Sequence, residues 1–558
     1  MSTTAEAAWW QTATVYQIYP KSFQDTTGSG TGDLRGVIRR LDHLEALGVD
    51  AVWLTPVYRS PQVDNGYDVS DYCAIDPAYG TMADFDDLVT ALHARGMKLV
   101  MDMVFNHTST EHPWFRSALL DPDSPYRDFY VWRPPACDGG PPNNWRSKFG
   151  GSAWSYEAES DQYYLHLFAP EQADLNWANP RVRSAVQDVV HFWARKGVDG
   201  VRLDVVNLIS KTPGLPDAEG TDGREFYTDG PDVHTYLQEF SRKVLRPYGL
   251  MSVGEMSSTT LEHCRRYADA SGRELSMTFN FHHLKVDYPN GDKWTVAPPD
   301  LVELKRLFTH WQQGMHGKAW NALFWCNHDQ PRIVSRFGDE GALHRQSAKM
   351  LALVLHGMQG TPYVYQGEEF GMTNPGYRSI ADYRDVESLN LHKEWTEAGT
   401  HESHILDVLA AKSRDNSRAP MQWDDTVNGG FTTGTPWLRP ATDAGSVNAQ
   451  AARKDEDSVF HTYKRLIALR KELDVLVHGD YTDLDPADSK VWSYVRRHGA
   501  DELLVVANFT GRPVGWERPA ALDGGGWLPL LGSYPQAMGT PTSGTLRPYQ
   551  AGMWLRRG

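Results

Sequence analysis

Three carboxylic acids stand at the ends of short apolar segments, each beside a residue that can hold or share its charge. Asp204 ends GVRLD, Glu255 ends SVGE, and Asp329 ends FWCNHD, where His328 precedes it. One such carboxylate is usually a salt-bridge partner or a turn cap. Three of them beside His, Arg or Asn are harder to explain structurally, because clustered like charges raise one another's pKa. The pattern indicates chemistry that needs carboxylates.

Cleavage of a glycosidic bond needs such a set. One carboxylate attacks the anomeric carbon while a protonated carboxylic acid donates to the leaving oxygen, and in a retaining enzyme the two lie about 5–5.5 Å apart. A further carboxylate can stabilise the positive charge of the transition state. Arg202 stands two residues before Asp204, so both side chains point to one face of a strand and Arg202 can keep Asp204 ionised. Glu255 must instead hold its proton, which burial or neighbouring carboxylates would favour.

Alternating strand and helix patterns position these residues. Expected strands are Val15–Tyr19, Ala51–Thr55, Lys98–Val104, Gly200–Asp204, Leu250–Gly254, Leu275–Phe279, Ala322–Trp325 and Pro362–Tyr365. Expected helices are Leu34–Leu47, Asp84–Arg95, Arg181–Arg195, Val233–Val244, Leu301–Trp311, Gly341–His356 and Ser458–Leu473. Eight strands that alternate with helices predict an α/β fold, a (β/α)8 TIM barrel, with an open doubly wound sheet as the alternative. In a barrel the strand-end carboxylates would converge on the catalytic face.

Two further regions stand apart from this alternation. The segment 106–174, after the third strand, is rich in Trp, Pro and Gly and is too long for a simple loop, so we expect an inserted subdomain on the catalytic face. After residue 475, short apolar runs alternate with Gly and Pro turns and predict an all-β domain. The expected division is therefore a barrel of 1–105 and 175–475, the insertion, and a C-terminal β-sandwich of 476–558.

Composition narrows the possible functions. The 558 residues carry a formal net charge of −16 and no basic run, which argues against nucleic acid and disfavours polyanionic substrates. The four cysteines form no CxxC pair, so a zinc site is not expected. The N-terminus lacks the pattern of a secretory signal, and no run of about 18 apolar residues predicts a membrane span. We expect a cytoplasmic protein with reduced thiols, no membrane contact, and a monomeric or weakly homo-oligomeric state.

An ordered series of motifs extends over most of the chain. It comprises GVDAVWLTPVYRSP (48–61), DMVFNH (102–107), QADLNW (172–177), GVRLD (200–204), GE (254–255), NHDQPR (327–332) and GEEFGMTN (367–374). In composition and order this series closely resembles the α-amylase superfamily, glycoside hydrolase family 13. The resemblance implies the same barrel, a retaining mechanism, a small-molecule α-glucoside as substrate and no required cofactor.

The resemblance also implies roles for individual residues. Asp204 matches the family's nucleophile, Glu255 its general acid/base and Asp329 its transition-state stabiliser. Residues that match the family's glucose-holding positions are Tyr67 and Asp68 (in NGYD), His107, Arg202 and His328. Arg414, within KSRDNSRAPMQW, matches an arginine that closes the pocket over the non-reducing glucose in similar enzymes. A closed pocket implies exo-action on short chains.

Within the family the chain looks most like oligo-1,6-glucosidases and dextran glucosidases, especially over DVVNLISKTPGLPDA (204–218). Those enzymes carry Val after the nucleophile, as Val205 does here, whereas maltose-preferring relatives often carry Ala or Thr. The expected activity is release of glucose from short α-1,6-linked glucosides such as isomaltose. The alternatives are an α-1,4-preferring α-glucosidase and a sucrose-acting transglucosylase or isomerase. A non-catalytic sugar-binding scaffold is disfavoured because all three carboxylates are present.

One departure from the family pattern concerns a metal. The loop 25–33 resembles an EF-hand-like calcium loop, with Asp25, Thr27, Ser29, Thr31 and Asp33 at the candidate ligand positions. Calcium affinity follows the number of charged oxygen ligands. Because only the two aspartates are charged, we expect structural calcium to be weakly bound or absent.

A second departure concerns the reaction. The segment Phe279–Pro289 matches the place where sucrose isomerases carry an arginine-rich motif. It has Lys285 and Asp287 but no arginine. This difference favours hydrolysis over isomerisation, although it leaves sucrose open as a glucosyl donor.

Overall fold

The computed structural model describes residues 8–536 and 538–558. Eight of its strands form a single sheet, in the order β13-β12-β11-β5-β2-β1-β15-β14. Their bounds are β1 Val15–Ile18, β2 Ala51–Leu54, β5 Lys98–Met103, β11 Gly200–Leu203, β12 Met251–Met256, β13 Met277–Asn280, β14 Ala322–Leu323 and β15 Thr361–Tyr365. The pairs β5–β11, β11–β12, β12–β13, β1–β15 and β14–β15 are parallel. The predicted eight-stranded α/β barrel fold is confirmed.

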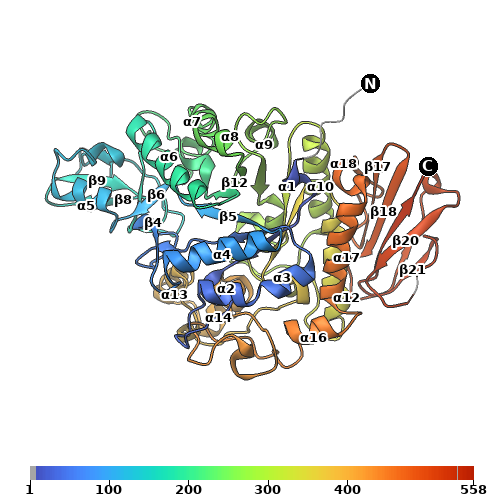
Figure 1. Cartoon of the computed structure of the whole chain (residues 1–558). Coiled ribbons are helices and arrows are strands. Elements are labelled where there is room, and N and C mark those ends of the chain that lie inside the picture. The colour runs from blue at the N-terminus through green and yellow to red at the C-terminus, as the bar shows by residue number, and fades with distance from the viewer. Residues whose placement is uncertain (1–7, 537) are drawn as a thin grey trace. The chain divides into compact units, whose positions relative to one another are not determined.

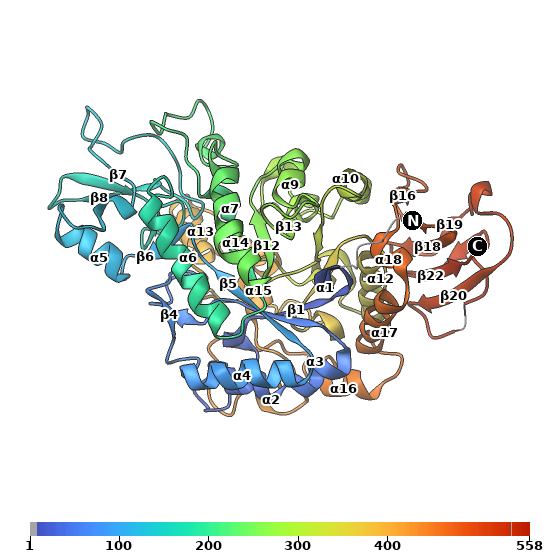
Figure 2. The same ribbon diagram turned by 45° about the horizontal axis from the view of Figure 1, so that its top comes forward.

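The chain divides into two compact units. Unit 1 comprises Met1–Val52, His282–Tyr383 and Thr400–Gly558, and unit 2 comprises Trp53–Phe281 and Arg384–Gly399. The helices of unit 1 are α1 Trp9–Thr12, α2 Leu34–Arg39, α3 Leu41–Leu47, α10 Leu301–Met315, α11 Ile333–Phe337, α12 His344–His356, α14 Glu402–Lys412, α15 Asp415–Arg418, α16 Ala449–Lys454, α17 Val459–Glu472 and α18 Asp474–His478. Those of unit 2 are α4 Met82–Ala94, α5 Pro113–Leu120, α6 Pro180–Arg195, α7 Val233–Phe240, α8 Arg246–Tyr248, α9 Leu261–Tyr267 and α13 Val386–Glu397. Figures 1 and 2 label most of these elements.

Helix α6 shows how the capping residues and the apolar pattern of the sequence build part of the buried core of unit 2. Asn179 caps its N-terminus by accepting a hydrogen bond from the Arg181 amide, and Pro180 occupies the first helical position. Both features favour a helix start. Its buried face includes Val186 and Trp193, as an amphipathic helix requires. The Trp193 indole also donates to a backbone carbonyl oxygen at 2.8 Å, so the helix is fixed in orientation as well as in depth.

The segment between β5 and α6 contains its own strands. They are β6 His107–Ser109, β7 Trp132–Arg133, β8 Trp154–Glu157, β9 Gln162–Leu165 and β10 Gln172–Asp174. Strands β7, β9 and β8 form a three-stranded antiparallel sheet, and β10 pairs with β6. A buried group that includes Trp145 and Trp154 packs in this region. These strands account for the length of the segment, and the predicted domain boundaries stay a prediction.

The C-terminal region forms a five-stranded antiparallel sheet in the order β16-β17-β18-β22-β20. Its strands are β16 Thr482–Asp483, β17 Val491–His498, β18 Asp501–Asn508, β20 Trp527–Gly532 and β22 Ala551–Arg556, and a separate pair joins β19 Val514–Trp516 to β21 Gly544–Leu546. Gly532 and Gly552 lie opposite each other in the β20–β22 pair. A pocket of about 370 Å³ opens beside the sheet, and Trp516 and Trp554 belong to its lining.

Several predicted elements have different limits in the structure. The predicted helix Leu34–Leu47 is two helices, α2 and α3, because the chain leaves helical geometry at Arg40, where φ is −104° and ψ is 5°. The helix expected over Val233–Val244 changes to a π-turn after Phe240. The strand expected over Ala322–Trp325 ends at Leu323. Element ends depend on hydrogen bonds and packing that a local sequence pattern does not contain.

Candidate active site

In unit 2, three carboxylates surround one arginine at the ends of adjacent strands; we call Asp102, Arg202, Asp204 and Glu255 the Arg202 cluster. Arg202 lies opposite Asp102 in the parallel β5–β11 pair. Its Nη1 lies 2.7 Å from Asp102 Oδ1 and 2.6 Å from Asp204 Oδ1, and its Nη2 pairs with Glu255. The structure therefore brings two of the three predicted catalytic carboxylates, Asp204 and Glu255, to one shared cation.

Glu255 differs from expectation in its place on the strand. The sequence predicted that its strand would end just before it, yet β12 continues to Met256. Glu255 instead lies opposite Phe279 in the parallel β12–β13 ladder. A residue held by backbone pairing on the strand is positioned more rigidly than one on a loop.

The Arg202 cluster has more acids than cations. Burial raises the pKa of Asp102 to about 7, an effect that Arg202 opposes and Asp204 reinforces. The phenol of Tyr67 and the indole of Trp53 both donate to Asp102 Oδ2, at 2.9 and 3.2 Å. Burial alone would lower the pKa of Arg202, but Asp102 and its other neighbours raise it. One permanent cation thus serves three carboxylates, which favours retention of a proton among them.

The three carboxylates of the Arg202 cluster differ in solvent exposure, and therefore in whether they can contact a ligand. The Asp102 side chain is fully buried, whereas those of Asp204 and Glu255 keep 10% and 13% of their surface. Asp102 belongs to the DMVFNH motif, but the sequence did not single it out as a site residue. It acts on the other two through Arg202, and only the exposed pair can meet a ligand. A carboxylate that attacks and a carboxylic acid that donates both need such access.

The turn after Asp204 is strained. Val205 has φ 36° and ψ 39° and is 8% exposed. A β-branched residue in left-handed geometry is an outlier that the surrounding fold must hold in place. A 3-10 turn over Val206–Leu208 follows at once. The chain therefore turns sharply away from the strand just behind the candidate nucleophile.

A residue that the sequence interpretation missed holds this turn. The buried Asn207 side chain donates from Nδ2 to the Ser257 carbonyl oxygen at 2.8 Å and accepts the Ser257 amide at Oδ1 at 2.9 Å. Asn207 comes three residues after Asp204, and Ser257 comes two residues after Glu255. One side chain therefore ties the two segments together. A buried Asn must find partners, but the sequence alone does not say which.

Of the other predicted residues of unit 2, Tyr67 and Asp68 lie after β2, and His107 begins β6. His107 Nε2 contacts the Tyr67 carbonyl oxygen at 2.9 Å, and burial lowers the pKa of His107, which favours its neutral form. The buried carboxylate of Asp68 accepts hydrogen bonds from Ser60 Oγ and the Val63 amide, at 2.9 and 2.8 Å. Asp68 thus closes its own loop, whereas the neighbouring Tyr67 points to the buried carboxylate of the Arg202 cluster.

In unit 1, the predicted residues His328, Asp329 and Arg414 gather with Arg418; we call these four the Asp329 cluster. Asp329 Oδ1 lies 2.7 Å from Arg418 Nη2 and 3.3 Å from Arg414 Nη1, and Oδ2 lies 3.1 Å from His328 Nε2. The sequence interpretation missed Arg418. It stands four residues after Arg414, and this helical spacing, which puts two side chains on one face, was the available signal.

The Asp329 cluster has the opposite charge balance. Burial would raise the pKa of Asp329, but His328, Arg414 and Arg418 together hold it well below its usual range. Gln17 Nε2 lies 2.8 Å from His328 Nδ1. Because the amide nitrogen can only donate, the proton of a neutral imidazole stands on Nε2, the atom nearest the carboxylate. The low pKa keeps Asp329 ionised near neutral pH.

The candidate calcium loop uses its charged oxygens internally. Asp25 Oδ1 accepts the Thr27 amide at 2.8 Å, and Oδ2 accepts the Gly30 amide at 2.7 Å. Asp33 Oδ1 accepts the Gly36 amide at 2.6 Å and so caps α2. Over residues 8–536 and 538–558, no group of three or more His, Cys, Asp or Glu could hold a metal ion. The expectation of weak or absent calcium stays a prediction.

The segment that begins at His282 gathers cations around a single acid. Asp287 is paired with both Arg336 and Lys412. Burial lowers the pKa of His282 to about 4, and the neighbouring Lys285 lowers it further. Two cations for one carboxylate leave an excess of positive charge around Asp287, and Lys285 belongs to the same short segment.

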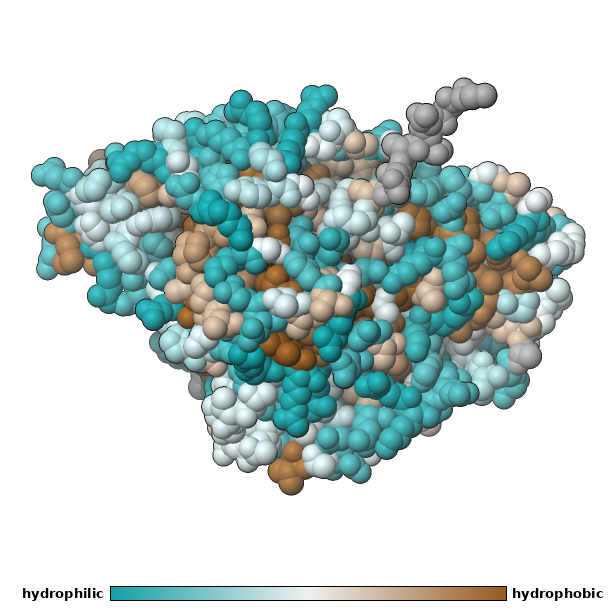
Figure 3. Space-filling view, viewed as in Figure 1, coloured by the Kyte–Doolittle hydropathy of each residue, from teal (hydrophilic) through white to brown (hydrophobic). Residues whose placement is uncertain are grey.

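Membrane crossing by a helix needs about 20 consecutive apolar residues. In the described part of the chain, no helix is both long and apolar enough to cross a bilayer. The face shown in Figure 3 mixes hydrophilic and apolar residues without a continuous apolar belt.

Known proteins match both the sequence and the fold. The alpha amylase catalytic domain family matches residues 17–479. The chain is 61% identical to a trehalose-6-phosphate hydrolase of Escherichia coli (strain K12), over 98% of this chain and 99% of that protein. It is 49% identical to an oligo-1,6-glucosidase of Halalkalibacterium halodurans, over 98% and 99%. A solved trehalose-6-phosphate hydrolase of Bacillus licheniformis superimposes with a TM-score of 0.95 at 52% identity, over 99% of this chain and 100% of that one.

Proposed function

We propose that this chain, which belongs to the α-amylase family of glycoside hydrolases, releases glucose with retention of configuration from a phosphorylated α-linked disaccharide. The favoured substrate is trehalose 6-phosphate, whose hydrolysis gives glucose and glucose 6-phosphate. In this proposal Asp204 is the nucleophile and Glu255 the general acid/base. Asp329 stabilises positive charge in the transition state.

The observation that carries the reaction type is the Arg202 cluster. Two partly exposed carboxylates share one arginine with a third, buried carboxylate. Arg202 Nη1 lies 2.6 Å from Asp204 Oδ1, so the pair holds the carboxylate in place. In the first step a carboxylate oxygen of Asp204 attacks the anomeric carbon, and Glu255 gives its proton to the leaving oxygen. In the second step Glu255 takes a proton from water as that water displaces Asp204.

Two observations support a phosphorylated substrate over the neutral disaccharide expected from the sequence. Relatives named as trehalose-6-phosphate hydrolases are 61% and 56% identical to this chain, against 49% for a relative named as an oligo-1,6-glucosidase. The segment that begins at His282 supplies the exposed cation Lys285, whereas the ion pairs of Asp287 with Arg336 and Lys412 are buried. The overall net charge of −16 does not oppose this, because recognition of one phosphate depends on local charge.

Parallel kinetics on trehalose 6-phosphate, trehalose and isomaltose test the proposal. We expect kcat/KM to be highest for the phosphate ester, by about a hundredfold or more, because a site that binds phosphate leaves its polar groups unpaired when the substrate lacks that group. The variant Lys285→Gln should narrow that ratio mainly through KM, whereas Lys318→Gln, at an exposed lysine elsewhere in unit 1, should leave it unchanged. Equal rates on trehalose and its phosphate would overturn the substrate assignment.

A second candidate is the α-1,6-glucosidase expected from Val205. The strained, buried Val205 directly follows the proposed nucleophile, and the chain shares 49% identity with an oligo-1,6-glucosidase. A higher kcat/KM on isomaltose than on trehalose 6-phosphate would favour this candidate. Products longer than the substrate would instead favour a transglucosylase.

Other parts of the proposal follow from the sequence. The enzyme requires no cofactor, and calcium is weakly bound or absent because the loop oxygens of Asp25 and Asp33 already accept hydrogen bonds. Its partner is a small α-glucoside, without nucleic acid or membrane. It works in the cytoplasm as a monomer or weak homo-oligomer.

A further inference from the structure

We propose that unit 1 contains a second anion site, which binds the phosphate group of a small molecule and shares no residue with the Arg202 or Asp329 clusters. The site is a pocket of about 530 Å³ whose lining includes Arg39, Arg40, His43, Trp423, Arg453 and Lys454. It is formed by the junction of α2 and α3, by α16, and by the loop at Trp423. Figures 1 and 2 both place α2, α3 and α16 close together, near the bottom of the view.

The pocket holds more positive than negative side chains. Its four cations are Arg39, Arg40, Arg453 and Lys454, and its two acids are Asp42 and Asp424. Among the residues that the structure describes, none of these four cations forms a salt bridge with a carboxylate. Cations normally find such partners when they gather in a concave surface, because their mutual repulsion is otherwise uncompensated. An anionic ligand would compensate it.

The side chain of Arg40 is fixed in position by two neighbouring side chains. Its guanidinium lies 4.3 Å above the Trp423 ring, and its Nε donates to Gln24 Oε1 at 2.6 Å. Burial lowers the pKa of Arg40 to about 10; the nearby Arg39 adds to this effect and Asp424 opposes it. The side chain is therefore charged near neutral pH. A guanidinium fixed by an indole and one hydrogen bond presents its Nη groups with little loss of entropy on binding.

His43 provides an independent sign of a missing partner. Its ring is 3% exposed, and its Nε2 lies 2.8 Å from Glu369 Oε1. Its buried Nδ1 has no hydrogen-bond partner in the part of the chain that the structure describes. The ring packs edge-on against Trp423, with centroids 5.3 Å apart. His43 thus adds to the pocket lining a polar ring atom to which the described residues offer no hydrogen bond.

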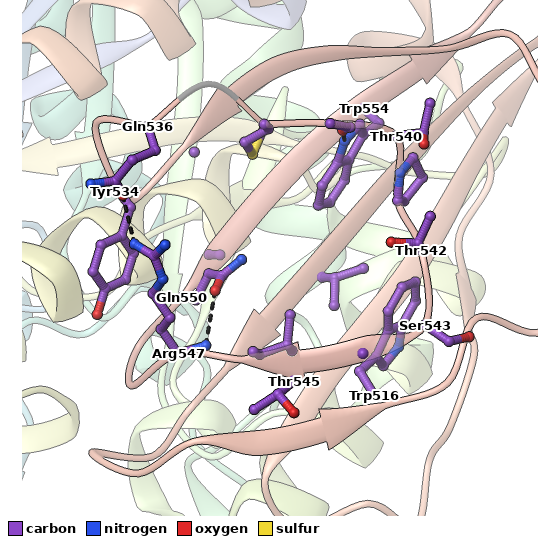
Figure 4. A pocket seen from close by; sticks show the side chains of 18 residues that line it. Trp516, Tyr534, Gln536, Thr540, Thr542, Ser543, Thr545, Arg547, Gln550 and Trp554 are labelled. Carbon is purple, nitrogen blue, oxygen red and sulfur yellow. Dashed lines mark hydrogen bonds between the residues drawn. The ribbon is translucent and has the colours of Figure 1, made fainter.

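The pocket beside the C-terminal sheet lacks the group of cations found in the pocket at Arg40. That pocket, seen in Figure 4, has a single charged side chain in its lining, Arg547. Arg547 Nη1 is already used by Gln536 Oε1 at 2.6 Å, and its guanidinium lies 5.2 Å from the Tyr534 ring centre. The pocket at Arg40 instead has four cations and two acids in its lining. A phosphate group suits it, because phosphate pairs with guanidinium groups.

Isothermal titration with inorganic phosphate and with glucose 6-phosphate tests the site. The test variant is Arg453→Ala/Lys454→Ala, which removes two exposed cations of the pocket, and the control is Arg306→Ala/Lys318→Ala, which removes two exposed cations elsewhere in unit 1. We expect both probes to bind wild type and the control, and to bind the test variant about tenfold more weakly. Thermal unfolding of each variant shows whether the fold is kept.

The outcomes are separable from the proposed activity. Glucose 6-phosphate that binds more tightly than inorganic phosphate identifies a sugar phosphate as the ligand, and equal affinities identify free phosphate. If no binding event weakens in the test variant, the site is overturned, as it is by equal weakening in the control. A second event that persists in both variants belongs to the proposed active site, whose product is also a sugar phosphate. Trehalose 6-phosphate hydrolysis at low phosphate is measured in the same variants. Its loss in the test variant alone would also overturn a site separate from catalysis.

Discussion

The Arg202 cluster and the Asp329 cluster hold similar side chains in opposite proportions. In the first, one arginine serves three carboxylates, and burial raises the pKa of Asp102 to about 7. In the second, two arginines and a histidine serve one carboxylate, and the pKa of Asp329 falls well below its usual range. The surplus charge decides whether a proton can stay. The first cluster suits groups that exchange protons, and the second suits a group that must remain charged.

The largest expected loss of activity follows from replacing Asp204 in the Arg202 cluster or Asp329 in the Asp329 cluster. Asp204→Asn and Asp329→Asn should each lower kcat by about 10⁴-fold or more, because groups that act as a unit fail together. The measurement is the initial rate on α-glucosyl fluoride, whose leaving group needs no acid. Asp222→Asn, at a partly exposed aspartate paired with Arg224, is the control and should keep full activity.

A small nucleophile distinguishes the two aspartates. Azide should rescue Asp204→Gly and give the inverted β-glucosyl azide, because azide can enter the space of the lost carboxylate and attack from the same side. It should not rescue Asp329→Gly, whose proposed role is electrostatic. Rescue of Asp329→Gly with Asp204→Gly left inactive would exchange the two roles.

Removing one cation from the Asp329 cluster sharpens the comparison. Arg418→Gln should lower kcat by about a hundredfold, as the loss of one charge-stabilising contact does in other active sites. It should also raise the pKa of Asp329, because burial is then less opposed. The acid limb of the kcat/KM profile should therefore move to higher pH.

The control for this change is Arg306→Gln, at an exposed arginine paired with Glu303. It should alter neither kcat nor the position of the acid limb. An Arg418→Gln enzyme with an unchanged acid limb would mean that Arg418 does not set the charge of Asp329.

The two clusters also differ in how far the sequence could predict them. Asp204, Glu255 and Asp329 stand in motifs at predicted strand ends, and alternation of strands with helices predicted the barrel that carries them. Asp102 lies in the motif DMVFNH and Arg418 in the segment KSRDNSRAPMQW, yet their roles depend on burial and on side-chain distances that no motif contains. The break of the predicted helix between α2 and α3 had no local signal either. The substrate is harder to predict from the sequence than the site residues, because one methylene or hydroxyl group changes specificity without changing a motif.

Asn207 gives a smaller effect, confined to the Arg202 cluster. Asn207→Ala removes the two hydrogen bonds to the Ser257 backbone, which hold the segments that carry Asp204 and Glu255. We expect kcat to fall by about tenfold to a hundredfold with KM little changed, because misplacement of reacting groups costs rate more than binding. Ser257→Ala is a matched control, since it keeps the backbone atoms that Asn207 uses.

A change in KM alone for Asn207→Ala would assign it to substrate binding. An equal loss of kcat in Ser257→Ala would show that the side chain of Ser257, and not the bridge, matters. Thermal unfolding separates both results from a general loss of fold.

The smallest expected effect is on the free energy of unfolding, and it tests whether the three carboxylates of the Arg202 cluster retain a proton. Because burial raises the pKa of Asp102 to about 7, Asp102 stabilises the fold when protonated and less so when ionised. Its contribution is complete below the ordinary aspartate pKa and is lost as pH rises through about 7. Between about pH 5 and 8 wild type should therefore lose more unfolding free energy than Asp102→Asn, as measured by urea denaturation.

Asp222→Asn should keep the wild-type pH dependence over that range, because Arg224 lowers the pKa of Asp222 to about 2. Parallel pH profiles for wild type and Asp102→Asn would mean that Arg202 keeps Asp102 ionised throughout, and the contrast between the two clusters would then rest on the number of carboxylates and not on a retained proton.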